Sequence, residues 1–212
     1  MDAFENVAKQ KIGAISALAV ANIAYSIDHF RDWPFVVLSS FQERSFTARI
    51  LADALFVSTL PLVSDENRAE WENEYVVSSD ADWIQDGIEY QIEAGLDEYV
   101  GRDDTHLGHD GNGHSADTFN PLGSQRIHHV DETGNLVPVK GPGPFLPYWQ
   151  ASPIVNHGFL NQDLFHDTAK ADMAKLCIST KSVVIGRLET ASPGTRTSLF
   201  YYHLMSFARG KE

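Results

Sequence analysis

Residues 141–153 read GPGPFLPYWQASP, and this stretch limits what the fold can be. Its four prolines lack backbone N–H groups, so neither a helix nor a central strand can run through it. The aromatic side chains between the prolines offer large apolar surfaces for packing. The segment therefore predicts an ordered aromatic loop, with the regular elements of the chain placed before and after it.

Elements of both kinds flank this loop. Before it, alternating residues around a turn predict a hairpin over 125–139. After it, we expect a helix at 161–177, a strand at 182–188 and a final helical pattern beyond Pro193. Strands that alternate with longer helices indicate an α+β domain.

The first half of the chain is mostly helical in pattern. Periodic apolar residues predict helices at 40–55 and 64–96, the second one capped by Ser64 and broken near 78–80. Between these helices, FVSTLPLV at 56–63 is typical of a strand whose proline places it at an edge or an exit. We therefore expect a sheet with helices packed against it.

A long helix is predicted over residues 3–31, and the Trp33–Pro34 step stops it because the residue before proline disfavours helical geometry. Its apolar stretch at 12–27 is shorter than the roughly 20 residues of a membrane span, so we expect a soluble chain with a buried or dimer-facing helix. The stripe suited to a partner helix comprises Ile12, Ile15, Ala19, Ile23 and Ile27. We divide the chain into this helix, residues 1–32, and a globular domain, residues 33–212.

Charge and cysteine content narrow the choice of partners. The 212 residues include 29 acidic and 16 basic side chains, which gives a formal net charge of −13 at pH 7. Such a balance repels phosphate backbones, so nucleic acid is not an expected partner. The single cysteine, Cys177, rules out an intrachain disulfide, and its place at the end of an apolar helical pattern predicts a buried thiol.

Three stretches carry a resemblance to a known family: WPFVVLSSFQERSFTARILADALFVSTLPLVSDENRAEWENEYVV from Trp33, DADWIQDGIEYQ from Asp80, and the hairpin followed by GPGPFLPYWQASPIV. From Val7 to Leu188 the chain resembles the ectodomains of receptor-type guanylate and adenylate cyclases of diatoms. Those ectodomains are similar to Cache and CHASE sensors, in which a long N-terminal helix leads into a PAS-type antiparallel sheet with packed helices.

The resemblance implies a ligand-sensing domain on the extracellular face of a membrane receptor, with catalysis left to a separate cyclase domain. In that family the sensor lies between two membrane helices, and further strands follow the position matched by Glu212. We accordingly expect this chain to have no catalytic activity of its own and no cofactor. A small-molecule ligand and a second copy bound through the first helix are the partners that the resemblance suggests.

The aromatic loop supplies the candidate ligand site, because small-molecule pockets combine apolar surface with a few placed polar groups. On the preceding hairpin, Arg126 is a candidate clamp for a ligand carboxylate. The alternative is a proline-stiffened loop that packs its rings into the core and leaves Arg126 in solvent. The candidate residues are Arg126, Phe145, Tyr148, Trp149, Gln150, Ser152 and Asn156.

A glycine-rich stretch over 97–123 holds another group of reactive side chains. His106, His109 and His114 lie there among aspartates, and imidazole with carboxylate suits zinc or another transition metal. Their spacing matches no helix-borne HExxH motif, and a solvated loop is the simpler interpretation.

Three functions stay open on these residues. A ligand sensor is the leading hypothesis, and a structural domain that dimerises without a small ligand is the second. The third is a metal-dependent enzyme centred on the 106–114 loop. Against an enzyme, the sequence holds no nucleophile elbow, phosphate-binding loop or dinucleotide fingerprint.

Overall fold

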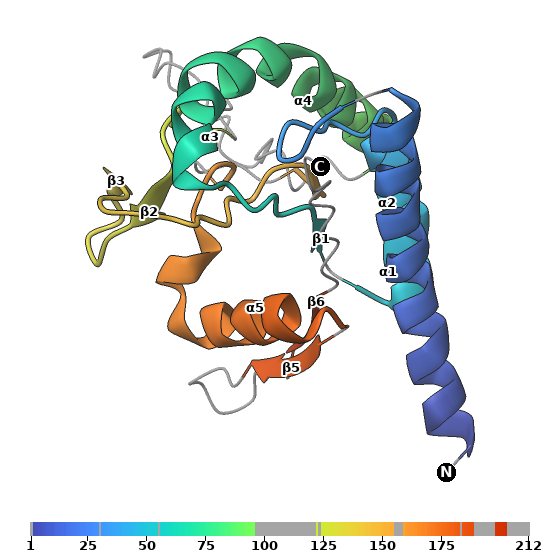
Figure 1. The fold of residues 1–212 in the computed structure, drawn as a ribbon. Coiled ribbons are helices and arrows are strands. Elements are labelled where there is room, and N and C mark those ends of the chain that lie inside the picture. The colour runs from blue at the N-terminus through green and yellow to red at the C-terminus, as the bar shows by residue number, and fades with distance from the viewer. Residues whose placement is uncertain are drawn as a thin grey trace, which may run out of the picture.

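Helices fill most of the first half of the chain, and most of the described strands lie in the second half beside helix α5, which confirms the α+β class (Figure 1). The long N-terminal helix is confirmed too: α1 spans Asp2–Asp28 and is followed by α2, Phe41–Ala52. The computed structural model describes residues 2–29, 31–54, 56–95, 122, 124–154, 159–182, 184–188 and 198–202.

α1 packs along α2, and the two helices run side by side in Figure 1. The face of α1 turned inward is marked by Leu18, Asn22 and Ser26, which are buried and spaced four residues apart. Of the predicted stripe, Ile15 packs against the cluster shared with α2, whereas Ile27 is 55% exposed. The chain's own α2 therefore covers part of the predicted stripe.

A continuous helix follows, built from α3 (Asp65–Glu70), the π-helical turn η1 (Trp71–Tyr75) and α4 (Val76–Glu93). The predicted cap is confirmed, because the hydroxyl of Ser64 accepts a hydrogen bond from the backbone N–H of Asn67 at 3.3 Å.

The break predicted near 78–80 is wrong, since the helix continues through these residues. Serine and aspartate have modest helix propensity, but the flanking side chains Val76, Trp83 and Ile84 are buried in the core. That burial outweighs local propensity, as is usual for helices within a folded domain. The irregular turn lies earlier instead, at η1.

The described strands form three antiparallel pairs: β1 (Val57–Ser58) with β4 (Ala151–Ser152), β2 (His128–Val130) with β3 (Leu136–Pro138), and β5 (Val184–Leu188) with β6 (Ser198–Tyr202). The β2–β3 pair confirms the predicted hairpin. Within the described ranges no strand takes part in two pairs, so these strands do not make one continuous sheet.

Two predictions for the C-terminal third need correction. The helical pattern expected after Pro193 is wrong over 198–202, where SLFYY forms β6, in keeping with the preference of aromatic residues for strands. The helix expected from 161 begins later: a 3₁₀ turn, η4 (Leu164–His166), precedes α5 (Thr168–Thr180).

The Gly141–Pro153 segment runs antiparallel beside residues 57–63. Backbone hydrogen bonds join Phe145 and Val63 in both directions, at 2.8 and 2.9 Å, and the N–H of Trp149 donates to Thr59 O at 2.9 Å. Because prolines interrupt the hydrogen-bonding pattern, the ribbon contains only the two-residue strands β1 and β4. The strand predicted over 56–63 is therefore much shorter than expected.

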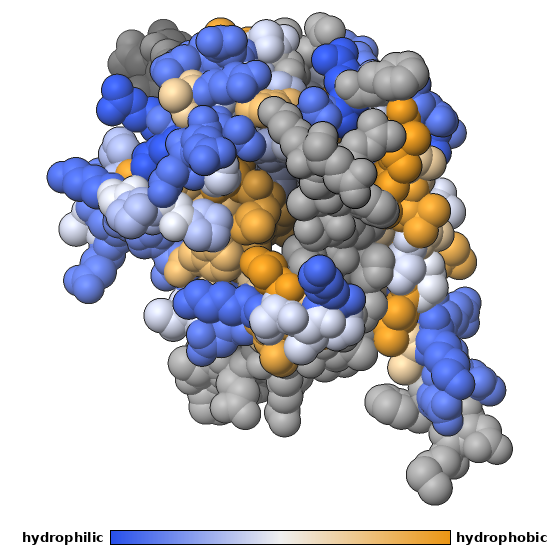
Figure 2. Space-filling model, viewed as in Figure 1, coloured by the Kyte–Doolittle hydropathy of each residue, from blue (hydrophilic) through white to orange (hydrophobic). Residues whose placement is uncertain are grey.

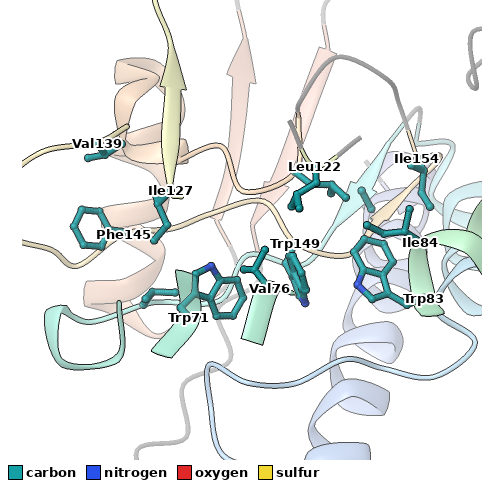
Figure 3. Packing of buried hydrophobic residues seen from close by; sticks show 13 residues of the cluster. Trp71, Val76, Trp83, Ile84, Leu122, Ile127, Val139, Phe145, Trp149 and Ile154 are labelled. Atoms are coloured by element: carbon teal, nitrogen blue, oxygen red, sulfur yellow. The ribbon is translucent and has the colours of Figure 1, made fainter. Parts of the chain in front are cut away.

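The main hydrophobic core lies where the inner face of the 65–93 helix meets the Gly141–Pro153 segment and the hairpin (Figure 3). In the described part of the chain, no helix has the length and apolar character needed to cross a membrane. The core is made of Val63, Trp71, Val76, Trp83, Ile84, Leu122, Ile127, Val139, Phe145, Trp149, Ala151, Ile154 and Leu160.

Candidate functional site

The three aromatic side chains of the Gly141–Pro153 segment are buried, but they do not line one pocket. Phe145 and Trp149 belong to the main core, whereas Tyr148 packs in a second cluster against Phe159, with ring centroids 4.2 Å apart. The guanidinium of Arg68 covers the Phe145 ring at 4.5 Å from its centroid. These rings hold the segment onto its neighbours on both sides.

The polar candidates of the same segment also have fixed partners. The side-chain amide of Gln150 accepts a hydrogen bond from Leu38 N at 2.8 Å and donates one to Leu38 O at 2.9 Å. Ser152 is buried in the β1–β4 pair. Gln150 therefore links two segments 112 residues apart, which is a structural role.

The two remaining candidates are not brought to this segment's core. Arg126 is exposed, and in the described part of the chain its guanidinium makes neither a hydrogen bond nor an ion pair. Asn156 lies outside the described residues. Ligand binding by the seven predicted residues accordingly stays a prediction.

Trp149 lies at the centre of a cluster of five aromatic rings, itself included, which we call the aromatic cluster. The Trp149 ring centroid lies 5.2 Å from that of Trp71, 5.4 Å from Trp83 and 5.7 Å from Tyr75. Phe35 joins through Tyr75, at 5.3 Å. Figure 3 shows the three tryptophans of the cluster in a row between the 65–93 helix and the Gly141–Pro153 segment.

The indole N–H groups of this cluster differ in their hydrogen bonding. Trp71 Nε1 donates to Asn161 Oδ1 at 2.9 Å, whose own amide donates to Gln125 O at 2.7 Å. The indole nitrogens of Trp83 and Trp149 are buried, and none of the described residues accepts a hydrogen bond from either. Buried donors without a partner are rare in native proteins, so this pair needs an explanation.

An open hollow lies beside the aromatic cluster, between the segment that follows α1 and the π-helical turn. Its volume is about 290 Å³, and we call it the outer hollow. Two aromatic rings of the cluster, Phe35 and Tyr75, form part of its wall. π-Helical turns of this kind occur frequently at functional sites. The lining residues are Arg31, Asp32, Phe35, Glu70, Glu74, Tyr75 and Ser78.

The charged side chains of the outer hollow are not neutralised by one another. Among the described residues, neither Arg31 nor Asp32 forms an ion pair, and the same holds for Glu70 and Glu74. The hollow thus offers one guanidinium, three carboxylates and a hydroxyl next to two aromatic faces. It can accept a small polar molecule that has an apolar or aromatic part.

The residues of this hollow were not among the predicted site residues, because an acidic run such as that over 70–74 is typical of a solvated helix face. In the structure, the three glutamates of this run have different surroundings. Glu72 is largely buried, pairs with Arg68 at 2.9 Å and accepts a hydrogen bond from Ile127 N at 3.1 Å, while Glu70 and Glu74 line the hollow. The spacing of four between Glu70 and Glu74 was the available signal, because it places them on one helix face.

A second hollow lies between α1 and α2, and we call it the α1–α2 groove. Its volume is about 500 Å³, and most of its α1 wall is made of alanines. Beyond it on α1, Val20 is 60% exposed. Figure 2 shows apolar side chains along much of α1. The lining residues are Ala14, Ala17, Leu18, Ala21, Ser40, Glu43, Arg44, Thr47, Ala48 and Leu51.

The metal candidates His106, His109 and His114 lie outside the described residues. In the part of the chain that the structure describes, no three His, Cys, Asp or Glu side chains are grouped so as to hold a metal ion. The prediction for Cys177 is confirmed: its thiol is buried and contacts Ser182 O at 3.1 Å.

Comparison with known proteins gives no family assignment. No protein-family model matches the chain, and neither a curated protein nor a solved structure matches it. The resemblance to cyclase ectodomains therefore rests on the three sequence stretches that carry it, and function has to be argued from the geometry of the site.

Proposed function

We propose that this chain is the ligand-sensing domain of a membrane receptor of the nucleotide-cyclase type, placed on the extracellular face and without catalysis of its own. In this proposal its strand pairs belong to a PAS-type sheet like that of Cache and CHASE sensors. The observation that carries the proposal is the outer hollow, where charged groups without ion-pair partners adjoin the aromatic cluster. Ligand pockets combine these features.

The position of the outer hollow suits the control of α1. Arg31 and Asp32 follow closely after the end of α1, and the backbone N–H of Arg31 donates to Ser26 O at 2.9 Å. The opposite wall belongs to the 65–93 helix. A ligand that contacts both walls binds more tightly when they are close together, so it shifts the population toward that arrangement of α1.

The Gly141–Pro153 segment takes a supporting role in this proposal. Trp149 packs against Tyr75, and Tyr75 lines the outer hollow. The segment therefore fixes the wall of the site from behind, while the ligand contacts other residues. Binding sites need such packed support if their contact groups are to keep their positions.

The proposal is tested by a thermal-shift screen of amino acids, organic acids, nucleosides and amines on the purified chain. We expect at least one compound to raise the melting temperature, and the Glu74→Gln and Arg31→Gln variants to reduce that rise. Glu93→Gln is the matched control, because Glu93 is an exposed carboxylate of the same helix outside the hollow. A rise that all three variants retain places the ligand elsewhere and contradicts the site.

The second candidate function is a structural domain that dimerises through α1 without a small ligand. The α1–α2 groove and, on another face of α1, the exposed Val20 and Ile27 favour this alternative. Sedimentation at increasing concentration, with Val20→Glu as the disrupting variant, detects such a dimer. Dimerisation combined with a screen free of hits would favour this candidate over the sensor.

A further inference from the structure

Trp71 packs behind both aromatic walls of the outer hollow. Its ring centroid lies 4.9 Å from that of Tyr75 and 6.3 Å from that of Phe35, and both of these rings line the hollow. Trp71 itself is fully buried and is not among the lining residues. Because side chains in a packed interior fix one another's positions, the orientation of the Trp71 ring helps to decide where the two walls stand.

Trp71 is also the first residue of the π-helical turn that carries part of the hollow. Glu74 and Tyr75 belong to this turn, and Glu70 directly precedes it. The backbone N–H of Val76 donates to Trp71 O, five residues earlier, and this bond closes the wide turn. A displacement of Trp71 would therefore move the carboxylates of the hollow together with its aromatic walls.

A single hydrogen bond fixes the orientation of the Trp71 ring. Its Nε1 atom donates to Asn161 Oδ1 at 2.9 Å, and both side chains are fully buried. An indole has only one N–H donor, so this is the one hydrogen bond that the ring can donate. Trp83 and Trp149, by contrast, donate to none of the described residues. Of these three tryptophans, only Trp71 is thus held by a hydrogen bond as well as by packing.

Asn161 is itself firmly anchored. Its side-chain amide donates to Gln125 O at 2.7 Å and to Ser124 O at 3.3 Å, and its backbone N–H donates to Tyr148 O at 2.7 Å. Its φ angle of 69° lies in the left-handed region, which asparagine adopts more readily than most residues. The oxygen that accepts the bond from Trp71 is therefore fixed by two chain segments that take no part in the hollow.

We propose that Asn161 is a positioning residue of the outer hollow, acting through the Trp71 indole on the rings of Phe35 and Tyr75. This inference rests on the proposed function, in which the hollow is the ligand site. Asn161 does not line the hollow and contacts no ligand there. Without its acceptor the Trp71 ring tilts, and the walls lose the spacing that a ring-bearing ligand needs.

Two variants of Asn161 separate positioning through Trp71 from a merely structural role. Glycine and aspartate both adopt positive φ angles, so neither variant strains the backbone. Asn161→Asp keeps an oxygen for Trp71 Nε1 and removes the amide donors, whereas Asn161→Gly removes both. The binding probe is phenethylamine, whose ammonium group suits the carboxylates of the hollow and whose ring suits its aromatic faces.

We expect Asn161→Gly to weaken phenethylamine binding by about tenfold, the equivalent of one buried hydrogen bond, and Asn161→Asp to stay within about threefold of the wild type. In ¹H–¹⁵N spectra the Trp71 indole signal moves upfield in the glycine variant only. Equal losses of affinity in the two variants overturn the proposal, because the amide contacts with Gln125 and Ser124 would then be the ones that matter.

Gln91→Leu is the matched control for lost stability. Gln91 is a buried amide that donates to Ile154 O at 3.1 Å, outside the hollow, so its loss destabilises the fold but leaves the affinity for phenethylamine unchanged. An affinity loss in Gln91→Leu as large as that in Asn161→Gly contradicts a specific role of Asn161. If the glycine variant does not fold, Trp71→Phe gives the same comparison, because it keeps a ring and deletes the N–H donor.

Ring motion in the free protein separates a failure of this inference from a failure of the proposed function. Once Trp71 is loosened, the rings of Phe35 and Tyr75 flip faster, and aromatic ¹³C relaxation measures this without any ligand. Faster flipping in Asn161→Gly alone, with no binding of phenethylamine or of any screened compound, supports the positioning of the walls and contradicts the sensor. Binding that needs Glu74 but is indifferent to Asn161→Gly supports the sensor and overturns the role of Asn161.

Discussion

The Gly141–Pro153 segment and the outer hollow meet at the aromatic cluster, but they differ in whether their polar side chains have partners within the chain. In the segment, both ends of the Gln150 amide are bonded to Leu38, and backbone groups pair with residues 57–63. In the hollow, Arg31 and Glu74 have no ion-pair partner among the described residues. The Gly141–Pro153 segment, which we call the closed region, has its polar groups hydrogen-bonded within the chain. The charged groups of the outer hollow remain available to bind a ligand.

This difference shows which signal identifies a site. In the sequence, the aromatic rings, amide and hydroxyl of the Gly141–Pro153 segment resemble the lining of a pocket. In the structure these side chains are buried in the interior of the domain. Polar groups that are buried and fully bonded hold segments together, because losing either partner leaves an expensive unpaired group. Groups that converge without partners beside apolar surface are the better candidates for binding.

The largest effect is expected from Trp149→Ala, which removes the ring at the centre of the closed region. We expect the free energy of unfolding to fall by about 3–5 kcal/mol, the usual cost of deleting a buried aromatic ring, as measured by urea denaturation. Arg126→Ala is the control, since this exposed arginine should change stability by less than about 0.5 kcal/mol. Similar small effects for both would show that the segment is not part of the core.

Gln150→Ala separates hydrogen bonding from ring packing in the same region. The change leaves the N–H and C=O of Leu38 without partners, and we expect a loss of about 2–4 kcal/mol, at about 1–2 kcal/mol for each of the two buried groups. Gln125→Ala, at an exposed glutamine, should be nearly neutral. If Gln150→Ala were equally neutral, water would have to reach Leu38, and the closed region would be open after all.

Local patterns predicted the elements that depend on nearby residues. The long first helix, the Ser64 cap and the β2–β3 hairpin follow from periodicity, a capping hydroxyl and a turn, and all are confirmed. The break near 78–80 was wrong because tertiary burial overrode propensity. Strand β6 was missed because its partner β5, not its own period, decides its form.

The candidate site was harder to predict, because it depends on contacts between distant segments. The outer hollow joins residues 31–35 with residues 70–78, and no sequence pattern links these two stretches. Nor does the sequence show that Trp71 donates a hydrogen bond to Asn161 while Trp83 has no acceptor among the described residues. Only the three-dimensional fold decides which side chains become hydrogen-bond partners.

A smaller effect tests how tightly the closed region is packed against α2 and α4. A Cβ atom at Gly87 would lie 2.5 Å from Ile154 Cδ1 and 2.8 Å from Gln42 Cγ. We expect Gly87→Ala to cost about 1–3 kcal/mol through overpacking. Gly13→Ala on α1 meets nothing within 4 Å and should gain about 0.5–1 kcal/mol from helix propensity. Thermal unfolding of the two variants should therefore shift in opposite directions.

The smallest effect concerns a group that is fully hydrogen-bonded but only partly buried, the Asp131 carboxylate at the hairpin turn. The hydroxyl of Thr133 and the backbone N–H of Asn135 donate to the carboxylate of Asp131 and lower its pKa from 3.8 to about 2. Because the pKa is lowered in the folded state, the turn contributes its stability above about pH 4 and loses it as the pH falls through 2. An NMR titration of the Asp131 carboxyl carbon measures this directly.

Thr133→Val removes the largest contribution and should raise the pKa of Asp131 toward 3.8. A wild-type midpoint near 3.8 would mean that the turn's hydrogen bonds are absent in solution. A midpoint near 2 would show that the hydrogen bonds outweigh the effect of partial burial, which by itself raises the pKa of Asp131. Full hydrogen bonding of a polar group would then not require full burial. The closed region would differ from the hairpin turn because its polar groups are both fully hydrogen-bonded and fully buried.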